Sequence, residues 1–201
     1  MPRQRRIWFP GAIYHITCCG NCKEALFYDE TDFLRYLSIL ESVRYQYPFY
    51  LHSYCLMTNH IHLLVETTHA HIKDIMKMLN FHYALHFNKR HNFIGHVFQD
   101  RYHSDLIDSA KYFLQASKYI HLNPKKASIV EQPANYRWSS YKSFISSNTN
   151  DHVVTSRVLS YFPEPQFEHY RKFVEAKEEE ATILLSCFKV PGDSPKKEVI
   201  I

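Results

Sequence analysis

The residues whose types and spacing best suit chemistry are two histidines, His60 and His62, in the segment NHIHLLVE. Side chains on a β-strand alternate between faces, so histidines at positions i and i+2 point to the same side of a sheet. Their Cα atoms would lie about 6–7 Å apart, which allows two imidazole nitrogens to bind one metal ion at roughly 2.1 Å. The segment therefore predicts part of a metal site on one face of a strand, while the aliphatic residues between the histidines face the core.

Further ligands are expected from a helix predicted over residues 109–123, in which Gln115, Tyr119 and Asn123 share one stripe. Asn123 can supply an amide oxygen as a third ligand, and Tyr119 lies one turn away, near the ion without binding it. A metal ion that polarises a phosphoryl oxygen allows a tyrosine to displace an alkoxide and form a phosphotyrosine. Mixed nitrogen and oxygen ligands with open positions suit Mg2+ or Mn2+, and two imidazoles shift the preference toward Mn2+ or, in vitro, Zn2+. From spacing alone, simple packing roles for the histidines and the tyrosine remain an open alternative.

The elements that must position these residues follow from hydrophobic periodicity. Alternation predicts strands at 12–18, 49–57 and 60–67 and a strand after a loop within 93–107, with helices at 32–47, 71–90 and 109–123. This β-α-β-β-α-β order is typical of an α+β, ferredoxin-like (split βαβ) antiparallel sheet. Both connecting helices are expected on one face, with the active-site helix near the other, open face. That helix is expected to end at Asn123, because Pro124 follows, and His15 on the first strand is expected to be a structural histidine.

Composition indicates an ordinary globular chain of 201 residues, of which 45% are hydrophobic and 22% charged. We predict a catalytic domain at residues 1–147 and a helical C-terminal extension at 148–201 that ends in a flexible tail. Five cysteines in this spacing form no disulfide framework. The sequence contains neither the roughly 18 consecutive apolar residues of a spanning helix nor a signal peptide at its start, so a cytoplasmic location with no membrane contact is expected.

Positive charge is concentrated in the first three quarters of the chain. The net charge is +4, but residues 151–201 carry seven Lys and Arg against nine Asp and Glu, so residues 1–150 carry +6. A basic body with many aromatic residues is compatible with a nucleic-acid partner. The expected phosphate contacts are Arg3, Arg5 and Arg6 in an N-terminal arm, and Lys125 and Lys126 beyond the proposed active helix.

The histidine segment also resembles a known motif. MTNHIHLLVE is similar to the HUH motif of single-tyrosine transposases, especially the REP-associated tyrosine transposases. Three further blocks resemble the same family in the same order: GAIYHIT with Gly20-Asn21; Gly95 with QDRYHS at 99–104; and YIHLNP at 119–124 followed by YRWSSY at 136–141. Together the four blocks cover about residues 10–145.

The resemblance implies roles for individual residues. It assigns metal binding to His60 and His62, the nucleophile to Tyr119 and the third ligand to Asn123, and Arg101 in the QDRYHS block is a further expected DNA contact. Such enzymes cut and rejoin single-stranded DNA, often beside an imperfect hairpin, through a 5′-phosphotyrosine that leaves a free 3′-hydroxyl. The resemblance does not decide between a monomer and a homodimer, nor whether the active helix serves its own subunit.

Two other function classes remain open from the sequence. A non-catalytic module could bind single-stranded nucleic acid on the open sheet face, as RNA-recognition domains do, and would be indifferent to chelators. A metallohydrolase or histidine-nucleophile nucleotide hydrolase could use the same histidines. The histidine-triad pattern, however, requires a further histidine where Leu64 stands.

Overall fold

The computed structural model describes residues 7–187, and its centre is a four-stranded antiparallel sheet. The strands are β1 (Ile13–Cys19), β2 (Phe49–Met57), β3 (His60–Thr67) and β4 (His103–Ile107), in the order β2-β3-β1-β4. Because β3 and β1 are the two central strands, both neighbours of the histidine pair are fixed by backbone hydrogen bonds. This order confirms the predicted ferredoxin-like α+β topology.

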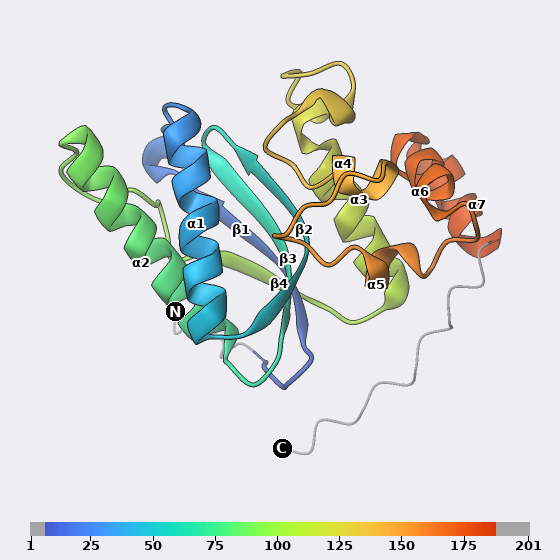
Figure 1. The fold of residues 1–201 in the computed structure, drawn as a ribbon, viewed down its shortest axis with the longest axis horizontal. Helices are drawn as coiled ribbons and strands as arrows, with labels where there is room; N and C mark the ends of the chain where they lie inside the picture. The colour runs from blue at the N-terminus through green and yellow to red at the C-terminus, as the bar shows by residue number, and fades with distance from the viewer. Residues whose placement is uncertain (1–6, 188–201) are drawn as a thin grey trace.

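Two long helices cover one face of the sheet, as predicted (Figure 1). They are α1 (Glu30–Gln46), whose N-cap Asp29 accepts hydrogen bonds from the backbone of Thr31 and Asp32, and α2 (Ile72–His91). Both contribute to an apolar cluster with the sheet residues Ile16, Leu63 and Val65. The helices thus bury the aliphatic side of β3.

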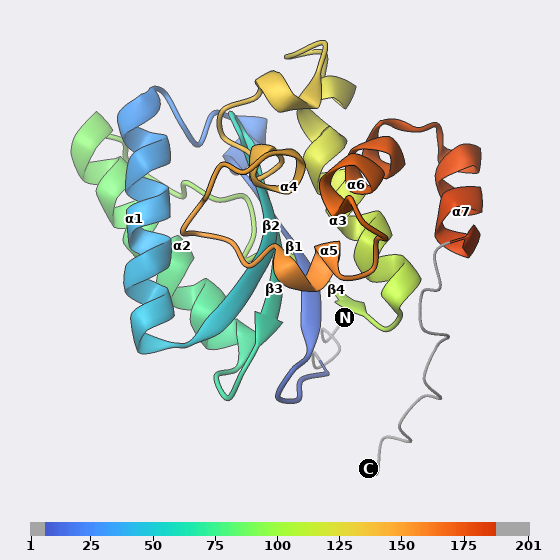
Figure 2. The same cartoon turned by 45° about the vertical axis from the view of Figure 1, so that its right-hand side comes forward.

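The opposite face carries the predicted active-site helix, but it is more covered than predicted. The helix α3 (Ala110–Lys126) packs on it, mainly against β2, and the shorter helices that follow pack against α3 and one another; Figure 2 shows these on the other side of the sheet from α1 and α2. His15 of β1 and His62 of β3 still line a groove beside α3. The shorter helices are α4 (Lys142–Ile145), α5 (Ser156–Leu159), α6 (Gln166–Glu175) and α7 (Glu178–Cys187). Apolar residues of α3, α5 and α6 form one continuous cluster with Leu64 of β3. The periodic patterns of individual segments do not reveal this packing, because it joins elements far apart in the sequence.

The end of α3 is also different from the prediction. The helix continues past Pro124 to Lys126, since the fixed φ of proline is compatible with a helix and only one backbone hydrogen bond is lost. Ala127 and Ile129 then close the end by donating to the carbonyls of Asn123 and Pro124, at 2.9 Å each. Lys125 and Lys126 therefore lie in the last turn of the active helix rather than in a following turn.

Several predictions fall outside the described residues. Arg3, Arg5 and Arg6 precede residue 7, and most of the expected flexible tail follows residue 187. Within residues 7–187, no helix is long and apolar enough to cross a membrane.

Candidate active site

The two histidines of β3 lie on the side of the sheet that α3 covers. His60 pairs with Cys19 of β1 and Met57 of β2, and His62 pairs with Thr17 and Cys55. The two rings are 5.0 Å apart between centroids and nearly perpendicular. His62 is only 4% exposed, so the packing of α3 converts a surface histidine into a buried one.

Helix α3 brings the predicted tyrosine and asparagine to these rings. Tyr119 is 42% exposed, and its ring centroid lies 5.5 Å from that of His62. Asn123, one turn later, places its Oδ1 atom 3.5 Å from His60 Nε2. The Ser109 hydroxyl caps the start of the helix by accepting from Tyr112 N. The structure therefore gathers all four predicted chemical residues at one place within a single chain.

Hydrogen bonds fix which atoms of His60 and Asn123 face each other. The Asn59 Oδ1 atom lies 2.8 Å from His60 Nδ1, and a carbonyl oxygen can only accept, so the proton is on Nδ1 and Nε2 carries a lone pair. Asn123 Nδ2 donates to the carbonyl of Tyr119 at 3.1 Å, which leaves the amide oxygen toward His60. Two acceptor atoms thus converge with no proton between them.

The loop that holds Asn59 depends on a glycine. Gly20 N donates to the carbonyl of Asn59 at 2.9 Å. A Cβ atom at Gly20 would lie 2.1 Å from the carbonyl oxygen of Glu24, so only glycine fits this approach. Gly20 therefore supports His60 indirectly, through the residue that sets its tautomer.

The second histidine is held by residues of β1. His62 Nδ1 lies 3.0 Å from His15 Nε2 and 3.2 Å from Thr17 Oγ1. Both neighbours can accept the Nδ1 proton, and that tautomer leaves a lone pair on His62 Nε2. The His15 ring also contacts the Tyr119 ring edge-on, with centroids 5.7 Å apart. His15 is therefore part of the site rather than a remote structural histidine, which corrects the expectation for it.

Electrostatics keeps the imidazoles neutral. Burial lowers the pKa of His62 to about 3, and repulsion from His15 and His60 acts in the same direction. Burial also lowers the pKa of His60 and of His15. Neutral imidazole is the form that binds metal ions, so the site is prepared to act as a ligand set at neutral pH.

The donor set fits a divalent cation with open coordination positions. Two ligand atoms that are each about 2.1 Å from one ion lie about 3.0 Å apart at an octahedral angle and about 3.4 Å apart at a tetrahedral angle. The 3.5 Å between His60 Nε2 and Asn123 Oδ1 therefore has to shorten by about 0.5 Å for an octahedral ion. Among the described residues, no group of three His, Cys, Asp or Glu side chains could hold an ion, so the amide oxygen is needed as the third ligand. Such an incomplete shell is typical of catalytic rather than structural sites.

A groove of about 620 Å³ runs along the exposed side of Tyr119. Its lining includes His15, His62, Gln115 and Lys126. Lys126 Nζ lies 4.7 Å from the centroid of the Tyr119 ring, so a positive charge stands over the ring. The acidic residues Asp105 and Glu178 also line the groove. The groove therefore presents both charge signs, with the cation next to the tyrosine.

The other predicted DNA contacts are dispersed. Lys125 is exposed in the same helical turn as Lys126 but does not line the groove. Arg101 lines a different groove, beside α2. The structure therefore does not join these cations into one surface with the tyrosine.

Sequence reasoning underestimated His15 and did not consider Thr17. The signal was available, because His15 and Thr17 are two apart on the first strand and share a face, as His60 and His62 do. The predicted topology already places that strand beside the histidine strand. Pairing the two strands in antiparallel register would have placed the His15 and Thr17 pair beside the His60 and His62 pair.

Comparisons with known proteins agree with this architecture. The family model described as "Transposase IS200 like" matches residues 9–123. No curated protein matches the sequence. A solved structure of a REP-associated tyrosine transposase bound to a REP hairpin has a TM-score of 0.61 at 15% identity, covering 77% of this chain and 98% of that chain. A candidate transposase from Deinococcus radiodurans R1 gives a TM-score of 0.42 at 18% identity, covering 64% of this chain and 92% of that chain. At 15% identity, the first likeness establishes the fold.

Proposed function

Because the chain belongs to the IS200-like transposase family, we propose that it cleaves and rejoins single-stranded DNA through a covalent bond to Tyr119. The observation that carries the proposal is the convergence of Asn123 Oδ1 and His60 Nε2 one helical turn from the exposed ring of Tyr119. A phenol beside an incomplete ligand shell is suited to phosphoryl transfer.

In the proposed reaction, Tyr119 Oη loses its proton and attacks the phosphorus of a phosphodiester. The Oη–P bond forms and the P–O3′ bond breaks, and the leaving 3′ oxygen takes up a proton to give a free 3′-hydroxyl. The 5′ end of the other fragment stays attached to Tyr119. A 3′-hydroxyl later attacks this phosphotyrosine, which restores the phosphodiester and releases the phenol.

His60, His62 and Asn123 would hold Mg2+ or Mn2+, which would polarise the phosphoryl oxygen and neutralise charge in the transition state. His15, Thr17 and Asn59 keep the two imidazoles in their binding tautomers. The ammonium of Lys126 attracts the phosphate toward the tyrosine.

The substrate is proposed to be single-stranded DNA with an imperfect hairpin near the cleavage site. The solved structure with the same fold holds a REP hairpin, which supports this choice of substrate. Since histidines and tyrosine meet within one chain, we propose that each molecule provides a complete site whether it is a monomer or a homodimer.

The decisive experiment follows a 3′-labelled oligonucleotide on a denaturing gel. Wild-type protein with Mn2+ should give a labelled protein–DNA adduct, which EDTA should abolish. Tyr119→Phe should bind DNA but give no adduct, whereas Tyr112→Phe, a tyrosine of the same helix that also lines the groove, should keep it. An adduct with Tyr119→Phe would show that the nucleophile is misassigned.

The same assay separates the alternatives. A non-catalytic binder would retain DNA in EDTA and never form the adduct. A nucleotide hydrolase would release nucleotides without a covalent protein intermediate.

A further inference from the structure

The outer surface of α2, on the opposite side of the sheet from the active site, carries a row of cations that the proposed chemistry does not use. Every fourth residue gives the sequence Lys73, Lys77, Phe81, Leu85 and Lys89, which places all five on one exposed stripe. Within residues 7–187, the three lysines make no ion pair. Lys73 and Lys77, at i and i+4, are like charges on one face of the helix, and such a pair is slightly destabilising on its own.

The stripe forms a ridge between two grooves. On one side, a groove of about 840 Å³ is lined by Lys73, Lys77 and Arg101, with Asp74 and Asp100 as its acidic residues. On the other side, a groove of about 800 Å³ between α1 and α2 is lined by Arg35, Lys89 and Arg90 and by no acidic residue. The flanks of the ridge are therefore positive on both sides.

Not every cation of the second groove is available. Arg90 pairs with Asp29 at 2.6 Å and with Asp32 at 2.5 Å. Arg35 and Lys89 have no such partner among the described residues, and both are exposed. The free positive charge thus lies at Arg35 and Lys89 on one flank and at Lys73, Lys77 and Arg101 on the other.

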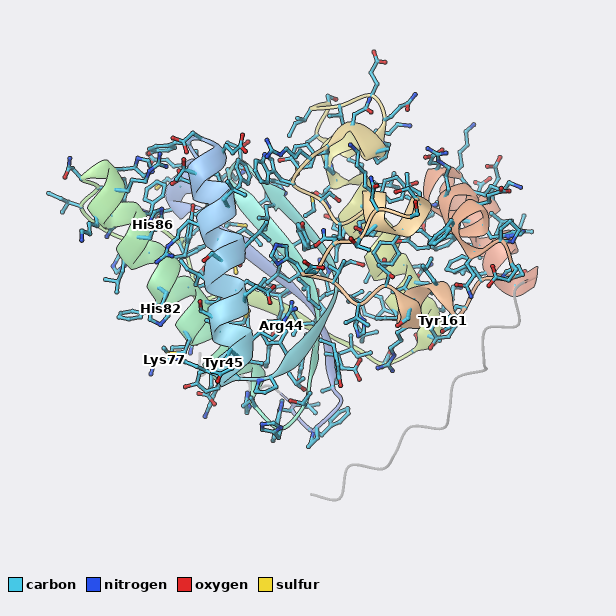
Figure 3. All side chains as sticks on the ribbon, viewed as in Figure 1. Arg44, Tyr45, Lys77, His82, His86 and Tyr161 are labelled. Carbon is cyan, nitrogen blue, oxygen red and sulfur yellow. The ribbon has the colours of Figure 1, made fainter. Side chains whose placement is uncertain are left out.

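Figure 3 shows the direction of this surface. Lys77 and His82 are labelled along α2, on the side of the molecule away from the C-terminal helices, whereas His86 lies between α2 and α1, with its Nε2 atom 3.5 Å from Asp32 Oδ1. The ridge also exposes Phe81 and Leu85, at 52% and 54%. Large apolar side chains among unpaired cations are typical of a binding surface rather than of a merely solvated helix.

We infer that α2 docks on duplex DNA, with the ridge in the major groove and the flanking cations on the two sugar-phosphate backbones. The major groove is about 12 Å wide and admits one α-helix, so the bordering phosphate strands would fall into the two grooves. From Lys73 to Lys89 the ridge is about 24 Å long, which spans roughly seven base pairs. The duplex that fits this surface is the stem of a hairpin.

A path joins this surface to the tyrosine. Arg101 lines the groove beside α2, and Asp105 of the edge strand β4 lines the groove beside Tyr119. These two residues are separated by only about 13 Å of extended chain. A single strand leaving the duplex would therefore pass around the β4 edge to reach Tyr119. This inference depends on the proposed function only for the choice of DNA as the polyanion.

The test measures binding of a blunt duplex of about 16 base pairs by fluorescence anisotropy between 50 and 200 mM NaCl. Lys73→Gln/Lys77→Gln and Arg35→Gln/Lys89→Gln should each weaken binding about 10-fold and reduce the slope of log K against log salt by about 2. The control Lys142→Gln/Lys172→Gln removes the same charge from exposed sites in α4 and α6 and should change neither value.

Cleavage of a short unstructured oligonucleotide separates this inference from the proposed function. All double variants should form the Tyr119 adduct on that substrate at the wild-type rate. Absence of an adduct in every protein, with the duplex losses intact, would reject the enzyme and keep the α2 surface. Equal losses in the control, or unchanged salt slopes in the α2 variants, would overturn the surface. Equal losses on vesicles of about 30% phosphatidylserine would also overturn it, because the surface would then be a general anion binder.

Discussion

The two sides of the central sheet are held together by different physics. On the α1 and α2 side, an apolar and aromatic cluster fills the space, and the carboxylate of Asp32 is buried beside it in an ion pair with Arg90. On the α3 side, most of the buried polar side chains of the described chain gather beneath the helix. The first side can tolerate exchange of one aliphatic group for another, whereas the second requires particular donors and acceptors. The comparison indicates that apolar packing stabilises both sides, and that the residues proposed for the chemistry are positioned on the second side only.

Neighbouring leucines of β3 test this division most strongly. Leu63 faces the α1 and α2 cluster and Leu64 faces α3, and both are fully buried. Leu63→Ala and Leu64→Ala should each lower the free energy of unfolding by about 2–5 kcal/mol. Below the melting temperature, only Leu64→Ala should also slow formation of the tyrosine adduct, because it loosens the packing under α3. Equal slowing by both variants would show that the two sides are not separate.

Acid should first destabilise the α3 side of the sheet, where the buried polar side chains lie. Burial lowers the pKa of His121, in α3, to about 3, while in the unfolded chain it titrates near 6.5. The unfolded state therefore binds more protons between these values, and stability present above pH 6.5 is lost as the pH falls toward 3. From pH 6.5 to 5 this single group should cost about 2 kcal/mol of unfolding free energy, measured by urea titration.

His121→Gln should reduce that dependence by about 2 kcal/mol between pH 6.5 and 5, and the part due to His62, whose pKa burial also lowers to about 3, should remain. His96→Gln, at an exposed position beside α2, is the matched control and should leave the slope unchanged. A wild-type slope that persists in His121→Gln would assign the acid sensitivity to other groups.

The smallest expected effect comes from removing a β1 residue that holds one of the proposed metal ligands in place. His15→Gln removes the ring that lies 3.0 Å from His62 Nδ1, and loss of such an outer partner typically costs about 10-fold or more in metal affinity. Electron paramagnetic resonance of Mn2+ added to the protein without DNA should show this loss with little change in melting temperature. His103→Gln, an exposed histidine of β4, should bind Mn2+ like the wild type.

Much of the site could be predicted because it lies in short local patterns. The i, i+2 histidines and the i, i+4 tyrosine and asparagine each require only the period of one element, and the family resemblance connected the two pairs. The covering of the second sheet face could not be predicted in this way. It depends on contacts between α3 and α6, about 50 residues apart, and on hydroxyl groups whose partners lie on other elements.

Lys118 illustrates this limit. A lysine beside the proposed nucleophile suggests phosphate binding, yet its Nζ atom is buried and donates to the carbonyls of Phe173 and Ala176 at the end of α6. A cation at a helix C-terminus is favourable because the carbonyls there lack intrahelical partners. The chemical type of a residue therefore did not reveal its role, and only the position of α6 did.

The buried hydroxyls beneath α3 form a chain of hydrogen bonds that begins and ends on β2. It leaves β2 at Ser53, passes through Ser117 and Tyr170 to His121, continues to Ser140, and returns to β2 at Tyr54. A neutral imidazole has one proton, so the tautomer of His121 sets the direction in which every hydroxyl in this chain of hydrogen bonds points. Sliding the helix by a single residue along the strand would reverse or break several of these dipoles together. The linked hydrogen bonds therefore fix the position of α3 along β2, and with it the position of Tyr119 relative to the sheet.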